Sequence, residues 1–514
     1  MWLARPKILP FLDTLLNRLV HKSFSQRSEI IQLIVISVLA LLITFLIWHL
    51  IRLWKDKKWI YIFCIVVCVL LIGILCLLQT LRRDDYWEIR DAVKYGFPGF
   101  IRYEYVNICG RYFSLFLKSL YPFFLSDINF FINCLLFFSF LLLFAGCSLL
   151  VNLLPGRFSR LETLWGGMLI AMGIMFMSPN IWEVWFWGGG TFIYGIGNAL
   201  TIMAAALMIS AELSSDHLAE KTIGAAVCIF CACGTSELNA ASVCAVSLLI
   251  LLVPKILYSR KLNRRNACLV LFSWGLTLLV LFTSGNLRGA GQLYGYETYT
   301  DLMTILRVLP EKLLVSVSSL FQYFSGRIEY ALIFLILAFF TGICLNTSPV
   351  SGKLLCSVFA GLIITAIGVL TINSILDFMP PRVLSIPMAW VILAFMLIMY
   401  QLGTLLKPII SPKADLNMTS ALLPLILITV VGWFYLNNIS LVRNIRTAWI
   451  ERDRELRSLS GTEKPAETCA IPVLGSSMSD PGKDPDWDFN IVTAYYYGIP
   501  SVTADHLCAP FGDR

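Results

Sequence analysis

The sequence predicts an all-α polytopic membrane protein with about twelve (11 to 13) transmembrane helices. Hydrophobic residues make up 58% of the chain and charged residues 14%, whereas an ordinary soluble domain has roughly 25% charged residues. A soluble fold could not bury so much apolar surface. Apolar segments long enough to cross a bilayer recur along the chain, and basic residues gather in alternate loops. A net charge of +8 located in such loops sets orientation, and we expect no nucleic-acid partner.

A membrane span needs about 20 predominantly apolar residues, and we predict one wherever the sequence supplies such a segment. The segment at 164–178 and the one at 222–234 are short, so we expect them to tilt little or to end in polar stretches buried against neighbours. The predicted spans are residues 29–50, 59–80, 122–152, 164–178, 190–212, 222–234, 240–258, 266–284, 328–346, 354–373, 383–406 and 419–438.

Lysine and arginine are concentrated in every second loop, which predicts that this set of loops faces the cytoplasm. The opposite loops, which include "RRDDYWE" and "NIWEVWFWGGG", are therefore predicted to face outward. One conflict remains, because this orientation places the basic N-terminal arm, residues 1–28, outside. The basic residues of the cytoplasmic set are Arg52, Lys55, Lys57, Lys58, Arg157, Arg160, Lys255, Arg260, Lys261, Arg264, Arg265, Lys407 and Lys413.

The composition divides the chain into three parts: the arm at 1–28, a membrane domain at 29–438, and an extracytoplasmic tail at 439–514. The tail is predicted to begin with a charged helix around residues 443–457. Its later stretch "IVTAYYYGIPSVTA" is typical of one or two short strands. Cys469 and Cys508 both fall in this tail, so a disulfide between them is compatible with the oxidising side of the membrane, and the sequence leaves the pairing open.

The first large outer loop, residues 81–121, begins with two adjacent carboxylates, Asp84 and Asp85, directly after a predicted span. Beside Tyr86 and Trp87 they could simply mark the membrane interface. The second half of the loop, "IRYEYVNICGRYFSLFLKSLY", spaces apolar residues near helical periodicity. We expect it to form a helix lying in the headgroup plane.

Other outward loops also carry polar and aromatic side chains where plain turn residues would suffice. Ionisable residues gathered on one side of a membrane usually line a cavity or a reaction site. Structural roles compete with this interpretation: Arg288 could cap a glycine loop, Arg382 could anchor the turn after two prolines, and Tyr194 and Asn198 could bridge helices. The candidate substrate-binding residues are Arg111, Tyr112, Glu183, Trp187, Tyr194, Asn198, Glu237, Asn239, Arg288 and Arg382.

Paired acids, arginines and aromatic rings on one face suit an anionic lipid that carries a sugar. A carboxylate can take a proton from an acceptor hydroxyl, and the guanidinium fork can donate two hydrogen bonds to a departing phosphate. Asp84 and Asp85 could instead coordinate a divalent cation. Because the four histidines (His21, His49, His217 and His506) lie away from the outer loops, we expect no zinc site.

The order of several short motifs resembles the GT-C superfamily of integral-membrane glycosyltransferases. These motifs are "DDYW", "GRY" at 110–112, "WFWGGGTFIYGIGNAL", "GTSELNA", "SGNLRGAG", "PPR" and "DWDFNIVTAYYYGI". They are most similar to an uncharacterised bacterial family of multi-spanning proteins regarded as being of that type. The resemblance implies that Asp84 is the base, that Asp85 assists it or binds metal, that Arg288 binds the donor phosphate, and that Glu237 serves the acceptor side. The chain departs from well-studied members in its extra N-terminal hydrophobic segment and its short tail.

We therefore expect an inverting glycosyltransferase of a bacterial inner membrane, with its active site facing outward. The donor would be a polyprenyl-phosphate sugar and the acceptor a cell-envelope glycan or lipid. A transporter or flippase for lipid-linked saccharides is the first alternative, but the sequence shows no internal repeat of the kind common in transporters. A polymerase or ligase of such saccharides is the second; the late outer loop at 285–327 holds three arginines and no histidine. An accessory membrane protein would leave the paired acids unexplained.

Overall fold

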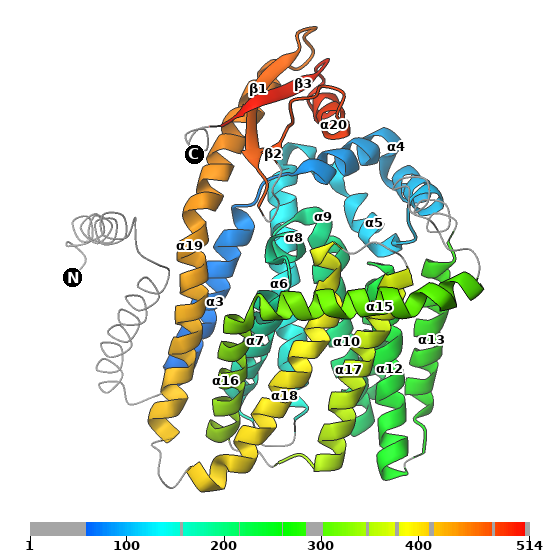
Figure 1. The fold of residues 1–514 in the computed structure, drawn as a ribbon, viewed down its shortest axis with the longest axis vertical. Coiled ribbons are helices and arrows are strands. Elements are labelled where there is room, and N and C mark those ends of the chain that lie inside the picture. The colour runs from blue at the N-terminus through cyan, green and yellow to red at the C-terminus, as the bar shows by residue number, and fades with distance from the viewer. Residues whose placement is uncertain are drawn as a thin grey trace, which may run out of the picture.

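The computed structural model describes residues 58–154, 158–214, 216–259, 261–283, 302–345, 349–375, 380–410, 416–474 and 479–508. Within these ranges, nine helices are long and apolar enough to cross a membrane, or up to ten if one bent pair is counted as a single span. Most of the described chain is helical, and the spans run side by side as a bundle (Figure 1). The prediction of an all-α polytopic membrane protein is confirmed at this level. The arm at 1–28 and the predicted span at 29–50 lie outside the described residues.

Each predicted span from residue 59 onward coincides with a helix of the bundle. Two of these helices, α11 and α16, have only 16 and 17 residues, which is short for a full crossing. The bundle helices are α3 (Lys58–Leu77), α6 (Ile128–Asn152), α7 (Arg160–Met177), α10 (Ile196–Leu213), α11 (Leu218–Cys233), α12 (Glu237–Tyr258), α13 (Arg264–Leu281), α16 (Ile328–Cys344), α17 (Gly352–Ile375), α18 (Ser385–Ile410) and α19 (Leu416–Ser458).

The first large loop is helical over most of its length and lies across one end of the bundle, which we call the outer end (Figure 1). Helix α4 (Arg83–Asn107) begins at the acidic pair and is kinked at Gly96, whose φ of 69° lies in the left-handed region. The expectation of one helix over 101–121 is wrong in detail. The chain leaves the helix at 108–111, around Gly110, and resumes as α5 (Tyr112–Lys118). The 3₁₀ helix η2 (Tyr121–Asp127) then leads into α6.

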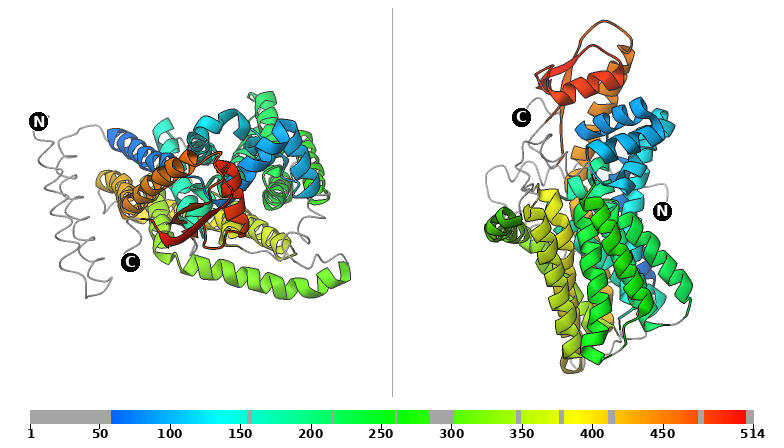
Figure 2. Two further views of the ribbon diagram at one scale, coloured as in Figure 1. Left: turned by 90° about the horizontal axis from the view of Figure 1, so that it is seen from above. Right: turned by 90° about the vertical axis from the view of Figure 1, so that its right-hand side faces the viewer.

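Helix α15 (Leu302–Ser325) runs across the bundle rather than along it, and Figure 2 shows it from above and nearly end-on. The stretch Arg307–Ser325 is bent by 74° from α16, which follows it. Leu314, Val317 and Phe321, spaced along one face of α15, are exposed apolar side chains. A helix of this kind is typical of the interface between lipid and water. The sequence analysis treated this stretch as loop.

The tail forms a small three-stranded sheet with strand order β2-β1-β3. Strand β1 (Ala466–Pro472) pairs antiparallel with β2 (Ser479–Asp480) and parallel with β3 (Val502–Leu507). The stretch "IVTAYYYGIPSVTA" was predicted to hold one or two short strands, and its end does so, as the start of β3. Its first part, "IVTAYYY", is instead in α20 (Asp488–Tyr497), because Asp488 stands in the first turn and Gly498 ends the helix in a left-handed conformation. Cys469 and Cys508 form a disulfide, which settles the pairing that the sequence left open.

Helix α19 is continuous through the predicted boundary at 438/439. The apolar last span and the charged helix expected after it are therefore one continuous helix. This helix extends beyond the outer end, where the sheet and α20 pack (Figures 1 and 2). The folded part of the tail begins only after Ser458.

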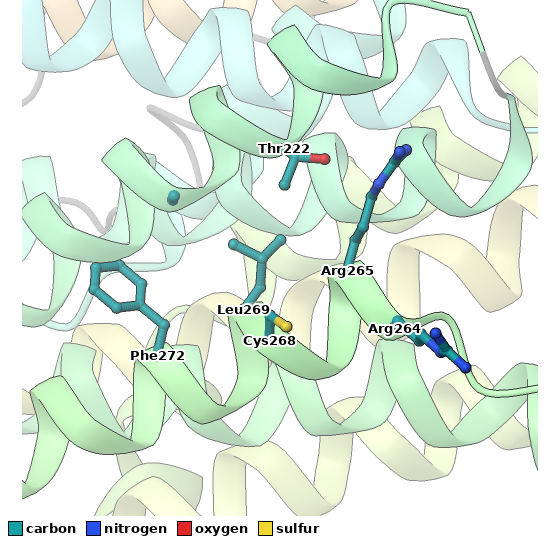
Figure 3. Close-up of a pocket in the computed structure, with 7 residues that line it drawn as sticks. Thr222, Arg264, Arg265, Cys268, Leu269 and Phe272 are labelled. Atoms are coloured by element: carbon teal, nitrogen blue, oxygen red, sulfur yellow. The ribbon is translucent and has the colours of Figure 1, made fainter.

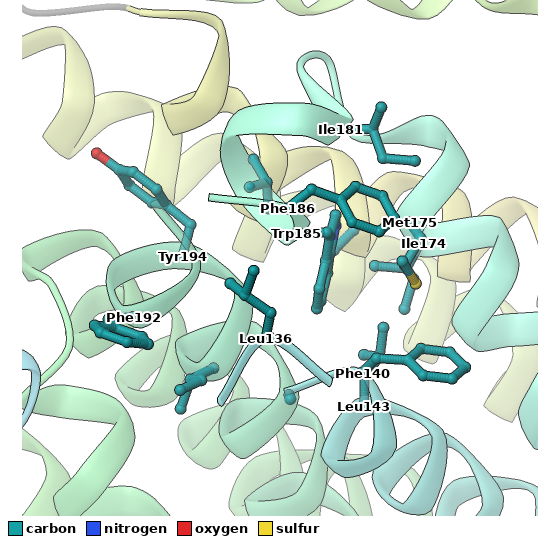
Figure 4. Close-up of a cluster of buried hydrophobic side chains, with 14 of the residues drawn as sticks. Leu136, Phe140, Leu143, Ile174, Met175, Ile181, Trp185, Phe186, Phe192 and Tyr194 are labelled. Atoms are coloured by element: carbon teal, nitrogen blue, oxygen red, sulfur yellow. The ribbon is translucent and has the colours of Figure 1, made fainter. Parts of the chain in front are cut away.

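Large buried aromatic side chains form the core beneath the outer end. Trp185 and Phe186 pack with residues of α6 and α7 in the cluster drawn in Figure 4. The Trp185 indole nitrogen donates a hydrogen bond to Ser178 Oγ at 2.9 Å. This core provides a rigid floor for the polar residues above it.

Candidate functional site

Charged side chains from six separate segments come together at the outer end, in what we call the outer-end network. Each member interacts with at least one other member through an ion pair, a hydrogen bond or a longer-range electrostatic interaction. The network therefore links residues as far as 300 positions apart in the sequence. Its members are Arg82, Asp84, Asp85, Glu88, Arg111, Lys118, Glu183, Tyr194, Glu237 and Arg382.

Arg82 and Asp85 form the first turn of α4. The backbone N–H of Arg82 donates to Asp85 Oδ2 at 2.8 Å. A carboxyl oxygen in this position satisfies the otherwise unpaired N–H group of the N-cap residue. The buried Arg82 guanidinium donates to Gln79 Oε1 at 2.6 Å and to the Phe186 carbonyl at 3.3 Å. This arginine therefore ties the acidic pair to the segment that follows α8.

Asp85 is almost completely buried, with 1% of its surface exposed. Burial, followed by the neighbouring Glu88 charge, raises the pKa of Asp85 to about 8. Its second oxygen, Oδ1, has no hydrogen-bond partner among the described residues. A Cβ built on Gly188 would stand 3.2 Å from this oxygen, so Asp85 Oδ1 faces the glycine run. At neutral pH we expect Asp85 to hold a proton.

Asp84 is only half-buried. It lies within electrostatic range of Asp85 and of the Arg382 guanidinium. Asp84 is thus the more accessible of the two adjacent acids. It also interacts with Arg382, which comes from a distant part of the chain. The pair predicted from the sequence consists of two carboxyl groups in different environments.

Glu88, one turn after the acidic pair, forms an ion pair with Lys118 of α5. Burial raises the pKa of Glu88, while Lys118 opposes the rise. Glu104, on the other arm of the kinked α4, also has its pKa raised by burial, to about 7. These contacts fasten α5 beneath α4 and add a buried cation to the network.

Glu183 and Arg382 form an ion pair, with Glu183 Oε2 and Arg382 Nη1 separated by 3.1 Å. The two residues are close because α8 (Ile181–Trp185) and the 3₁₀ helix η4 (Pro381–Leu384) both lie at the outer end. The Arg382 guanidinium also stands over the Trp187 ring, 5.5 Å from its centroid. Carboxylate and ring together fix the direction of this guanidinium.

The glycine run allows α8 to lie directly against the segment that begins the next span. A Cβ on Gly190, in α9 (Gly188–Gly190), would fall 1.7 Å from the Glu183 carbonyl oxygen. No other residue type fits there without moving the backbone. Glycine at this position therefore helps to place Glu183 opposite Arg382.

A second ion pair joins α5 to α12. Arg111 Nε, at the start of α5, lies 3.1 Å from Glu237 Oε2 and 3.2 Å from Oε1, in the first turn of α12. Glu237 is buried, and the Arg111 side chain is 30% exposed. The network thus presents a second arginine that is anchored by one carboxylate and still reaches solvent.

Tyr194 stands between the two pairs. It belongs to η3 (Thr191–Gly195), a π-helical turn, and such turns are frequent at functional sites. Tyr194 is within electrostatic range of both Arg111 and Arg382. Its hydroxyl points away from the aromatic core in Figure 4. Two arginines therefore converge on one phenol.

Four buried polar atoms around the glycine run have no hydrogen-bond partner in the described part of the chain. They are Asp85 Oδ1, Trp187 Nε1, Thr191 Oγ1 and Asn198 Nδ2. Buried polar atoms are normally paired, and a group of exceptions is a feature of sites that bind water or a ligand. Of the four, Asp85 Oδ1 belongs to the acidic pair itself, and the other three lie in or beside the segment that carries the glycine run.

Neither a protein family model nor a curated protein matches the chain. Its function must therefore be inferred from its own residues.

Two of the predicted site residues make hydrogen bonds that hold neighbouring segments together. The Tyr112 hydroxyl donates to the Phe230 carbonyl at 2.6 Å and secures α5 to the end of α11. Asn239 Nδ2 donates to the Ile193 carbonyl at 2.8 Å, which satisfies a carbonyl of the π-helical turn. Asn198 does not make the interhelical bond considered for it through its amide nitrogen. Arg288 lies outside the described residues.

Sequence reasoning missed Arg82, Glu88 and Lys118 as members of the site. Arg82 stands in the stretch "RRDDYWE" itself, but a basic residue at a membrane boundary is ordinarily a topology signal. Glu88 lies one helical turn after Asp85, a spacing that would have revealed it once α4 was known to start at the acidic pair. Lys118 had no comparable signal.

Proposed function

We propose that the chain is an inverting glycosyltransferase that takes a sugar from a polyprenyl-phosphate donor at the outer face of a bacterial inner membrane. The acceptor would be a hydroxyl of a cell-envelope glycan or lipid. The observation that carries the proposal is the gathering of Asp84, Arg111, Arg382 and Tyr194 at one end of the bundle, although they come from distant parts of the sequence. The resemblance of the motif order to GT-C glycosyltransferases supports the same reaction.

Asp84 would act as the general base. It takes the proton of the acceptor hydroxyl as that oxygen forms a bond to the anomeric carbon. The bond between the anomeric carbon and the phosphate oxygen breaks, and its electron pair stays on the polyprenyl phosphate. Attack opposite to the leaving group inverts the anomeric centre. A positioned base contributes typically 10²–10⁴-fold to rate.

Arg111 and Arg382 would bind the leaving phosphate. Each uses one nitrogen to hold a glutamate, at 3.1 Å in both pairs, and retains other N–H donors for the substrate. Fixed guanidinium groups stabilise developing negative charge without reorganising during the reaction. Trp187 and Tyr194 offer aromatic surface and a hydroxyl for the sugar. Asp85, protonated at neutral pH, would donate a hydrogen bond through Oδ1 while its Oδ2 accepts from the Arg82 N–H.

A divalent cation at Asp84 and Asp85 stays a prediction. Within the described ranges, no group of three His, Cys, Asp or Glu side chains is arranged to hold a metal ion. Magnesium sites often combine one or two carboxylates with substrate phosphates. Asp84 and Asp85 could supply the carboxylates of such a site. No step of the mechanism above depends on it.

The test is sugar transfer in membranes that contain the full chain and a radiolabelled polyprenyl-phosphate sugar. Asp84→Asn should lower transfer at least about a hundredfold, because the isosteric amide cannot accept the proton. Asp127→Asn is the matched control. Asp127 lies at the same end, at the start of α6, but is exposed and outside the network, so this variant should transfer at the wild-type rate.

Equal expression and membrane insertion of both variants would attribute the loss to chemistry. Normal transfer by Asp84→Asn would remove Asp84 as the base. Movement of the labelled lipid across the bilayer without a new glycosidic bond would instead identify a transporter. Extension of the lipid-linked saccharide itself would identify a polymerase.

A further inference from the structure

A groove lies between α11 and α13 at the opposite end of the bundle from the outer-end network, where both helices begin (Figure 3). Its volume is about 350 Å³. Basic loop residues predict that this end faces the cytoplasm. The lining residues are Thr222 and Ala226 of α11 and Arg264, Arg265, Cys268, Leu269 and Phe272 of α13.

The body of the groove is apolar. Leu269 and Phe272 form one wall and Ala226 the other, and the exposed side chains Ile223 and Val227 of α11 adjoin them. In a membrane helix this surface faces lipid chains. The small Ala226 opposite Phe272 leaves room for an inserted hydrocarbon.

The two arginines are at the end of the groove nearest the membrane surface. Figure 3 shows Arg265 reaching from α13 toward the helix that carries Thr222, while the guanidinium of Arg264, in the same first turn, points away from the groove. Neither guanidinium forms an ion pair with an acid within the described chain. Arg265 therefore places an unneutralised positive charge at the mouth of the apolar groove, and the exposed Arg264 adds a second charge beside it.

The acids on neighbouring elements have other partners. Glu212, at the end of α10, accepts hydrogen bonds from Asn263 and Asn266 at 2.8 and 3.1 Å. Glu220, in the first turn of α11, contacts His217. Lys221 of α11 and Lys261 before α13 add further positive charge. Asp216, in the turn before α11, accepts a hydrogen bond from Ser214 at 3.3 Å. The four cationic side chains therefore outnumber the three acids, which favours an anion.

The dimensions also match one class of ligand. Arg264 and Phe272 are eight residues apart, which corresponds to about 12 Å along a helix. This length suits much of one lipid acyl chain beneath its phosphate. A free phosphate ion would use the arginines but leave the apolar walls unmatched.

We infer that this groove is a binding site for an anionic phospholipid, with the phosphate at Arg264 and Arg265 and one acyl chain along Leu269 and Phe272. Basic pockets between membrane helices on the cytoplasmic side are suited to such headgroups. The inference is independent of the proposed sugar transfer, because the groove lies at the other end of the bundle.

The test is native mass spectrometry of the full chain in detergent, titrated with phosphatidylglycerol or with phosphatidylcholine of the same acyl chains. Wild-type protein should bind phosphatidylglycerol roughly ten- to thirtyfold more tightly. The double variant Arg264→Gln/Arg265→Gln should lose that preference. Arg160→Gln/Lys353→Gln, which removes two exposed charges at the same end outside the groove, should keep it.

A second variant tests the apolar part. Ala226→Phe keeps both arginines but fills the space opposite Phe272, so it should weaken phosphatidylglycerol binding as well. Soluble sn-glycerol 3-phosphate should not compete. The inference is overturned if the Arg264→Gln/Arg265→Gln variant retains the full preference, if Ala226→Phe binds as the wild type does, or if the soluble phosphate displaces the lipid at equal concentration.

Discussion

The Trp449 indole nitrogen donates a hydrogen bond to the Tyr86 hydroxyl at 3.0 Å. This contact joins the last membrane helix, α19, to the residue that follows the acidic pair in α4. The Tyr86 ring also meets Tyr496 of α20 edge-on, at 5.1 Å between centroids, and Arg452 of α19 donates to the Asp480 carbonyl in β2. The tail and the outer-end network are therefore packed as one body.

The contact between Trp449 and Tyr86 should stabilise the protein and set the position of α4. Trp449→Phe removes the donor and leaves the buried Tyr86 hydroxyl with one partner fewer, so we expect a loss of about 1–3 kcal/mol in unfolding free energy. Thermal unfolding in detergent measures it. In a double-mutant cycle, Tyr86→Phe should cost less in the Trp449→Phe background than in the wild type. Strictly additive losses would show that the two side chains do not interact.

The ion pair of Glu183 and Arg382 predicts unequal effects on sugar transfer. Arg382→Gln should lower transfer about ten- to a hundredfold, because in the proposed mechanism the guanidinium binds the leaving phosphate. Glu183→Gln keeps the Arg382 guanidinium but removes the charge that holds it in place, so this variant should lower transfer less. The rate of transfer at saturating donor separates the two. A larger loss in Glu183→Gln would reverse the assignment and make the carboxylate the group that contacts substrate.

Burial of Asp85 predicts a specific dependence of stability on pH. Because its pKa is raised to about 8, the folded state binds more protons than the unfolded chain from about pH 4 to pH 8. The contribution of Asp85 to the free energy of unfolding is therefore present at low pH and is lost as the pH rises toward 8. Asp85→Asn should abolish that loss, so its melting temperature should exceed the wild-type value most clearly above pH 8.

Glu104 supplies the control for this measurement. Its pKa is raised to about 7, so Glu104 should destabilise the folded protein progressively as the pH rises to about 7. Glu104→Gln should abolish that part of the pH dependence. Melting curves from pH 5 to 9 distinguish the two windows. If the difference in melting temperature between the wild type and Asp85→Asn stays constant from pH 7 to 9, Asp85 is not a buried acid that holds its proton at neutral pH.

Gly190 should tolerate no side chain. Alanine there would place its Cβ 1.7 Å from the Glu183 carbonyl oxygen and force α8 away from η3. We expect a destabilisation of about 1–3 kcal/mol and a further loss of transfer, because Glu183 and Arg382 separate. Gly275→Ala in α13 is the control, since nothing lies within 4 Å of its added Cβ. Equal melting temperatures for the two variants would argue against the close approach.

The sequence was sufficient to place helices at the predicted spans from residue 59 onward, because an apolar segment of about 20 residues has one favourable environment and one way to satisfy its backbone. It was less informative where short polar segments fold by contact with one another. Residues 101–121 have helical spacing, yet Gly110 and the docking of Tyr112 on α11 divide them into two helices. The periodicity of "IVTAYYY" was ambiguous, and Asp488 and Gly498 at its ends favoured a helix.

For the site, the sequence by itself determined which residue types stand at the membrane boundary: the carboxylates Asp84 and Asp85, and arginines in separate outer loops. Only the tertiary structure decided that Arg382 neighbours Asp84 while Asp85 turns inward beneath Gly188, and that Arg82 and Lys118 belong to the same network. The physical reason is that composition and spacing fix how a segment meets lipid or water. Which charges lie next to each other depends instead on how distant helices pack, and no single segment encodes that packing.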